Sequence, residues 1–281
     1  MANVLDDPWV AEAVRRFQDD YRSVIANRRV DVIGKNKSIL KFGRNLDLTS
    51  GTQETIWDVG IDNETYVEDN LINRISSSSA SDTQTIRVEG HYLADGGYHF
   101  VILDVPLNGQ TPVGEGIVIT DAYGQYGGAL ARNSRLANLS GTRLVGDVYV
   151  YQDTQTVTAG VPQDLTKVHA KIRGAAGLQQ SNKCATTISN EDFYILTSSR
   201  VGVAKAQAAF VDFSLEVREH GGTFRERTIG NGSRDSGFNP IFEKPPYIVV
   251  PPNSDIRITG ISSANTTTGI AEFNGILGAL V

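Results

Sequence analysis

Apolar and polar residues alternate one by one over residues 209–218, and this stretch limits the possible folds more than any other part of the chain. Because successive side chains of a β-strand point to opposite faces, a period of two is typical of a strand with one face in a core. The apolar face consists of Ala209, Val211, Phe213, Leu215 and Val217. Gly221 and Gly222 follow, and a second strand-like segment begins at Thr223, so we predict a β-hairpin here.

The chain after Leu71 has the same character, with short strand-like segments separated by turn residues. Glycine is abundant, with 28 residues, and methionine occurs once, which favours a turn-rich β protein over a helical one. Residues 153–174, which contain Gly160 and Pro162, are the best candidate for a domain boundary. We therefore predict a mainly β protein with two tandem β-sandwich or jelly-roll domains, at residues 39–165 and 166–281.

Residues 1–38 differ from the rest, because their apolar residues follow a helical period. Asp7 and Pro8 form a helix start, since Asp accepts backbone N–H groups at an N-cap and Pro suits the first helical position. The apolar residues that follow form a heptad seam of Val10, Val14, Phe17, Tyr21 and Val24. Two interpretations stay open: an amphipathic helix on the chain's own surface, or a docking and trimerising leader that an extended arm joins to the body.

Residues 39–60 connect this leader to the β body. Phe42 ends an apolar strand-like segment, and Trp57 lies near the apolar residues Ile56 and Val59. We therefore favour Trp57 as the anchor of a core or an interface over a residue that stacks on a ligand. Together with the heptad residues, Phe42 and Trp57 are the predicted contacts to an oligomeric or docking partner.

Charge and cysteine content argue against several classes of protein. The net charge of −6 and the pI near 5.3 argue against a nucleic-acid partner, because phosphate recognition depends on clustered Lys and Arg. The single cysteine, Cys184, excludes an internal disulfide framework and indicates synthesis in a reducing cytosol. No stretch resembles a secretory signal peptide or approaches the roughly 18 apolar residues of a membrane span, so we expect no membrane partner.

Residues typical of catalytic and metal sites are scattered. The four histidines, His91, His99, His169 and His220, lack metal-ligand spacing. A zinc pair of His91 and His99 across a hairpin is a weak alternative, because no third ligand is evident. Cys184 has no neighbouring base, and the acidic residues after Trp57 are typical of a solvated loop or a weak Ca²⁺ site. We predict no enzymatic activity, no metal site and no cofactor.

A flexible aromatic loop at residues 123–128 supports one alternative function. Its aromatic side chains, Tyr123 and Tyr126, are candidate stacking platforms for a sugar, together with Trp57. In this alternative the chain is a carbohydrate-binding β-sandwich that takes part in host recognition.

Four segments, in order along the chain, resemble a family of tailed-bacteriophage virion proteins. The first is an FGRN segment that leads to an Ile-Trp pair, at residues 42–45 and 56–57. The second is a serine-rich tract followed by a T-x-T-I-x-V-E-G strand, at residues 76–90. The third is a V-x-L-N-G-x-T-P-V turn at residues 105–113, and the fourth is a V-R-E-x-G-G-x-F-R hairpin at residues 217–225.

The resemblance implies a structural component of a bacteriophage particle and carries over no active-site residues. Our leading interpretation is a homotrimer attached to the outside of the capsid through its N-terminal region, with the major capsid protein as its partner. A place in the tail, neck or baseplate, with tail proteins as partners, is the alternative. In both cases the protein is made in the bacterial host cytoplasm and resides in the virion.

Overall fold

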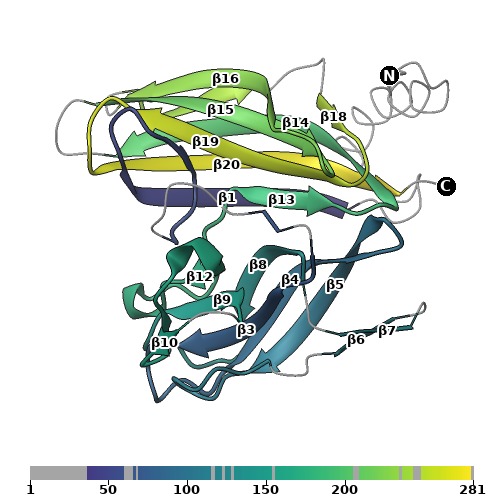
Figure 1. Cartoon of the computed structure of the whole chain (residues 1–281). Helices are drawn as coiled ribbons and strands as arrows, with labels where there is room; N and C mark the ends of the chain where they lie inside the picture. Colours follow the sequence, from purple (N-terminus) through teal and green to yellow (C-terminus); the bar gives the residue numbers. More distant parts are fainter. Residues whose placement is uncertain are drawn as a thin grey trace.

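The computed structural model of the protein is built almost entirely from antiparallel β-strands (Figure 1). It describes residues 37–59, 66–67, 69–114, 118–121, 124–127, 130–153, 156–204, 209–233, 236–242 and 248–279 of the 281. Within these ranges the only helical elements are two short 3-10 turns, η2 (Leu165–Lys167) and η3 (Gly174–Ala176). The predicted mainly β class is confirmed, and the predicted leader helix lies outside the described residues.

Strands from both ends of the described chain form two facing sheets, which we call the terminal sheet pair. The first sheet has the order β1 (Lys37–Leu48), β20 (Thr267–Ala279), β14 (Asp192–Ala204) and β17 (Phe238–Phe242), with β18 (Ile248–Val250) also paired to β14. The second has the order β13 (Ala185–Ile188), β19 (Ser254–Ser262), β15 (Phe210–Glu219) and β16 (Arg225–Ser233), with β2 (Gln53–Thr55) also paired to β19. Their inward side chains form one hydrophobic core, in which Phe213 and Phe273 are fully buried.

Strand β15 confirms the strand and the hairpin predicted from the alternation. The odd-numbered residues 211–217 are buried in the core, whereas Phe210 on the opposite face is 60% exposed. β15 pairs with β16 through a turn in which Gly221 has a φ of +69°. Glycine adopts this left-handed conformation without the steric cost that a Cβ atom would add.

The middle of the chain forms a second pair of sheets, the central sheet pair. One sheet has the order β12 (Val168–Ile172), β9 (Val148–Gln152) and β3 (Ile72–Ser77), and the other has the order β5 (Gly97–Pro106), β4 (Thr85–Ala94) and β8 (Arg132–Asn138). Two small hairpins accompany them, β6 (Val118–Asp121) with β7 (Gly124–Gly127) and β10 (Val157–Thr158) with β11 (Val161–Pro162). The central pair has a hydrophobic core of its own, separate from that of the terminal pair.

The path of the chain differs from two consecutive domains. β1 pairs with β20 and β2 pairs with β19, so residues 37–55 belong with the strands after residue 184, and the central pair is inserted between them. The expected division between residues 165 and 166 therefore does not follow the strand pairing. Alternation along a strand shows which face is buried but not which strand lies beside it, so it carries no information on this insertion.

The chain passes between the two pairs near Trp57 and again near Lys183, where the two segments form an isolated antiparallel bridge. Trp57 is 1% exposed and packs in a third, small hydrophobic cluster with Tyr149, Tyr151 and Val168. In Figure 1, β1 and β13 lie along the side of the terminal pair that faces the central pair. This junction contains the candidate site.

Candidate functional site

The junction between the sheet pairs collects polar side chains from strands that are distant in sequence. On β4, Val88 and Tyr92 enter the central core, whereas Glu89 and His91 lie on the opposite face of the sheet, toward β1 and β13. The same face of the sheet presents Phe100 on β5, which pairs with His91. One sheet of the central pair thus offers a polar and aromatic outer face to the edge of the terminal pair.

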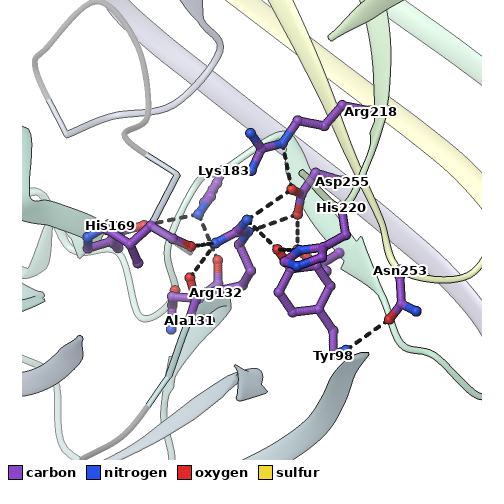
Figure 2. Close-up of polar contacts among 12 residues, drawn as sticks. Tyr98, Ala131, Arg132, His169, Lys183, Arg218, His220, Asn253 and Asp255 are labelled. Carbon is purple, nitrogen blue, oxygen red and sulfur yellow. Dashed lines mark hydrogen bonds and ion pairs between the residues drawn. The ribbon is translucent and has the colours of Figure 1, made fainter. Parts of the chain in front are cut away.

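A buried ion pair joins the two sheet pairs at this junction (Figure 2). Arg132, the first residue of β8, donates from Nε to Asp255 Oδ1 at 3.0 Å and from Nη2 to Oδ2 at 3.3 Å. The side chains of Arg132 and Asp255 are 2% and 0% exposed. The carboxylate also accepts hydrogen bonds from Arg218 Nε at 2.8 Å and from Thr187 Oγ1 at 2.7 Å. Asp255 on β19 is therefore held by side chains from β8, β13 and β15.

Tyr98 on β5 extends this cluster. Its hydroxyl accepts a hydrogen bond from Arg132 Nη2 at 2.5 Å and lies 2.8 Å from His220 Nδ1. The Arg132 guanidinium also lies 4.8 Å from the centre of the Tyr98 ring, within the range of a cation–π interaction. The backbone N–H of Tyr98 donates to Asn253 Oδ1 at 2.9 Å. Tyr98, from the central pair, is therefore fixed by His220 and Asn253 of the terminal pair.

The buried negative charge of Asp255 is offset by the positive charges of two arginines. Burial by itself raises the pKa of Asp255, but the Arg132 and Arg218 guanidiniums and the Thr187 hydroxyl outweigh burial and hold the pKa below its ordinary value. Asp255 is therefore ionised at neutral pH, opposite two guanidiniums. Buried charges are tolerated when they are paired and hydrogen-bonded, and Asp255 meets both conditions. This geometry suits the joining of two sheet pairs.

Lys183 forms a second connection at the same junction. It is 5% exposed, and its Nζ donates to the backbone oxygens of Asn133 at 2.7 Å and His169 at 3.1 Å (Figure 2). Its amine also lies 5.8 Å from the centre of the Trp57 ring. Lys183 thus connects β8 and β12 to the segment in which the chain returns to the terminal pair.

A cavity of about 460 Å³ lies next to the ion cluster, between β1, β13 and the outer face of the sheet β5-β4-β8. Thr187, which binds Asp255, is also part of its lining. Lys41 enters from β1, and its Nζ donates to the backbone oxygen of Ser134 at 3.0 Å. Burial lowers the pKa of the Lys41 amine to about 8, even though Glu89 acts in the opposite direction. The amine is therefore still mainly protonated at pH 7.

A β-bulge shapes the wall of the cavity opposite Lys41. β4 pairs Glu89 with Arg135 but Gly90 with Asn133, so Ser134 is an extra residue in β8. Ser134 and His91 are 4% and 3% exposed, and within the described ranges Ser134 Oγ and His91 Nδ1 have no hydrogen-bond partner. Burial lowers the pKa of His91 to about 3, so its ring is neutral at pH 7. Bulges often redirect a side chain beside a functional site, and here the bulge places Ser134 in the cavity wall.

The predicted contact residues lie in different places. Phe42 is on β1, is 36% exposed and lines the cavity, so its predicted contact role stays a prediction. Trp57 is a core residue, and its predicted role at an interface does not fit its burial inside the chain's own small cluster. The heptad residues Val10, Val14, Phe17, Tyr21 and Val24 lie outside the described residues. So does Tyr123, while Tyr126 belongs to β7 with its side chain outside the described part.

Strand pairing and burial determine the surroundings of the histidines and the cysteine. His91 pairs with Phe100 and His99 pairs with Tyr92, so the two histidines lie on opposite faces of the hairpin and cannot form the zinc pair considered above. Burial lowers the pKa of His169 to about 3 and raises that of the Cys184 thiol well above its ordinary value. Among the described residues there is no group of three or more His, Cys, Asp or Glu side chains arranged to hold a metal. The same part of the chain has no helix long and apolar enough to cross a membrane.

Sequence reasoning missed the residues that dominate the junction. Arg132 and Asp255 are 123 positions apart, and neither is part of a recognisable motif. For Lys41 the sequence offers one indication of a special role, because a charged residue lies inside the apolar segment 39–42 that was predicted to be a strand. Ser134 and His91 had none, since the bulge that brings them together depends on strand pairing.

Comparisons with known proteins add little. No protein-family model matches the chain, and no curated protein matches it significantly. One similar solved structure is the VP2 subviral particle of infectious bursal disease virus, with 9% identity, coverage of 89% of this chain and 73% of that chain, and a TM-score of 0.23. Another is a structure of the Gt strain of that virus, with 8% identity, coverage of 89% and 74%, and a TM-score of 0.21. These TM-scores are too low to support an argument about fold or function.

Proposed function

We propose that the protein is a non-enzymatic structural component of a bacteriophage particle, attached as a homotrimer to the outside of the capsid through its N-terminal region. The attribution to a phage particle rests on the four segments that resemble virion proteins. The structural role is supported by how the junction uses its buried charges.

The observation that carries the structural role is the Arg132–Asp255 cluster. Asp255 is fully buried and accepts hydrogen bonds from three side chains, so the most buried charges of the junction are used to hold the sheet pairs together. A catalytic carboxylate needs access to a substrate and often a pKa shifted toward the working pH. Asp255 has neither, because it is enclosed and its pKa is lowered.

The resembling segments support the same role, because two of them form one packed corner of the central pair. Gly109, in the turn segment, donates its N–H to the Asp82 backbone oxygen at 2.8 Å, and Ser77 donates its N–H to the Gly109 oxygen at 3.0 Å. Gly109 has a φ of +55°, and a Cβ atom there would lie 2.5 Å from the Ala80 oxygen. The Asp82 carboxylate accepts the N–H groups of Val145 and Gly146 at 2.9 Å each. These segments therefore specify turns and their packing.

The proposal includes a finer description of the body. We propose that the terminal and central sheet pairs are two β-sandwich units, the second inserted into the first, in place of two consecutive units. β1, the edge strand of its sheet, follows directly on the segment proposed to attach the protein. The leader thus joins the body at the edge of a sandwich, beside the junction.

The test is attachment of the full chain to purified phage particles that lack it. We expect the wild-type chain to sediment with particles and to have the mass of a trimer in solution. Val14→Asp together with Phe17→Asp is expected to abolish both properties, because each puts a charge into the heptad seam. Gln18→Asp, a charge outside the seam, is the matched control and is expected to leave both unchanged. A monomer that does not bind particles, or a double variant that still attaches, would contradict the proposal.

The same purified chain and phage particles also distinguish two alternative functions. Attachment to tails but not to heads would favour a place in the tail, neck or baseplate. Binding to a glycan array that Tyr126→Ala abolishes would favour host recognition through a sugar.

A further inference from the structure

The Lys41 amine has no anionic partner among the residues that the structure describes. It is not part of an ion pair within the described ranges, and its one hydrogen bond there goes to the neutral backbone oxygen of Ser134. Glu89, the carboxylate that acts most strongly on it, is engaged by Arg135, with 3.4 Å between Arg135 Nη1 and Glu89 Oε1. A cation removed from water is stable when an anion or several acceptors replace the water, and the cavity beside Lys41 has room for such a group.

Two buried polar atoms on the wall opposite Lys41 lack a hydrogen-bond partner among the described residues. Ser134 Oγ and His91 Nδ1 are buried and make no hydrogen bond. Buried polar atoms are nearly always hydrogen-bonded in proteins, so a group of unsatisfied atoms around one cavity calls for an explanation. The Lys41 ammonium has three donors and no acceptor, so it suits the acceptor oxygens of a carboxylate.

The mouth of the cavity is apolar. Leu40 and Phe42 on β1 are 56% and 36% exposed, and Phe100 on β5 is 44% exposed. All three residues line the cavity. Binding pockets for small molecules typically measure about 300–1,000 Å³ and combine apolar walls with a few polar groups that fix the ligand's orientation. The cavity of about 460 Å³ has this combination.

We propose that this cavity binds a small amphiphilic carboxylate. Its head group accepts a hydrogen bond from Lys41 Nζ, and its short apolar chain packs against Phe42 and Phe100. This inference is independent of the proposed virion role, because it concerns the junction cavity and not the N-terminal region.

The test is titration of the full chain with sodium octanoate at pH 7, followed by isothermal calorimetry. We expect saturable binding with one site per chain. 1-Octanol, which has the chain without the charge, and acetate, which has the charge without the chain, are both expected to bind at least tenfold more weakly. Lys41→Met is expected to weaken octanoate binding at least tenfold, a difference of about 1.4 kcal/mol in binding free energy.

Two further variants keep the result interpretable. Lys167→Met removes a lysine of η2 that is not part of the cavity and is expected to bind octanoate as the wild type does. Phe42→Ala changes a partly exposed side chain, so folding is expected to be unaffected while octanoate binding weakens several-fold. The proposal is overturned if wild-type protein shows no saturable octanoate binding. It is equally overturned if the folded Lys41→Met and Phe42→Ala variants both bind as tightly as the wild type.

Discussion

Replacing Arg132 by Met tests whether the buried ion cluster holds the sheet pairs together. The substitution keeps much of the side-chain volume but removes the donors to Asp255, to the Tyr98 hydroxyl and to the backbone oxygens of Ala131 and Val67. Removing one partner of a buried ion pair typically costs about 3–5 kcal/mol. Asp255 keeps its hydrogen bonds from Arg218 and Thr187, so we expect the lower end of this range, about 3 kcal/mol.

The assay is equilibrium urea unfolding at pH 7, supported by thermal unfolding. An unfolding entropy of about 2.1 cal/mol/K per residue gives about 0.6 kcal/mol/K for 281 residues, so 3 kcal/mol lowers Tm by about 5 °C. Asp255→Asn is expected to cost more, about 4–5 kcal/mol, because it leaves two guanidiniums without their carboxylate. The double variant is expected to cost less than the sum of the single changes, since the two residues interact directly.

Arg87 provides a matched control. It forms a two-point ion pair with Asp104, at 2.9 Å for each contact, but the side chains are 38% and 42% exposed. Arg87→Met is expected to leave the urea midpoint unchanged within error, because water screens this pair. If Arg132→Met changes the unfolding free energy by less than about 1 kcal/mol, or no more than Arg87→Met does, the cluster does not have the role assigned to it.

Three further predictions concern other parts of the fold. Burial raises the pKa of Asp58 to about 7, so the contribution of this group to stability is present below about pH 4 and is lost as pH rises through 7. We expect the urea midpoint of the wild type to fall between pH 5 and 8 for this reason, and Asp58→Asn to remove this part of the fall. Gly43→Ala places a Cβ atom 2.1 Å from the Ile56 oxygen, and circular dichroism is expected to show unfolding at a temperature several degrees lower. Trp57→Ala is expected to cost about 3–5 kcal/mol in urea unfolding, and an unchanged midpoint would contradict its burial in a core.

Local patterns in the sequence predicted the elements well. The alternation over residues 209–218 specifies β15 and its buried face, because the period of two is a property of the strand itself. The paired glycines before Arg225 specify the hairpin to β16, and Asn108 with Gly109 specifies a tight turn. In each case the information lies within about ten residues.

The arrangement of those elements could not be predicted in the same way. Pairing of β1 with β20 joins residues more than 200 positions apart, and the pattern of β1 is equally compatible with other neighbours. The junction depends on this pairing, because β1 brings Lys41 to the cavity and β19 brings Asp255 to Arg132. A charged residue in an apolar strand was the available signal for Lys41, and it did not identify the partner surface.

Imaging of virions most directly tests the central claim, that this protein is a structural component on the outside of a phage head. The measurement is single-particle electron microscopy of phage virions purified from a host culture in which the chain is produced. We predict ordered density on the outer capsid surface into which the terminal and central sheet pairs fit, with three copies around each attachment point. Virions that lack this density on the outer capsid surface would contradict the account.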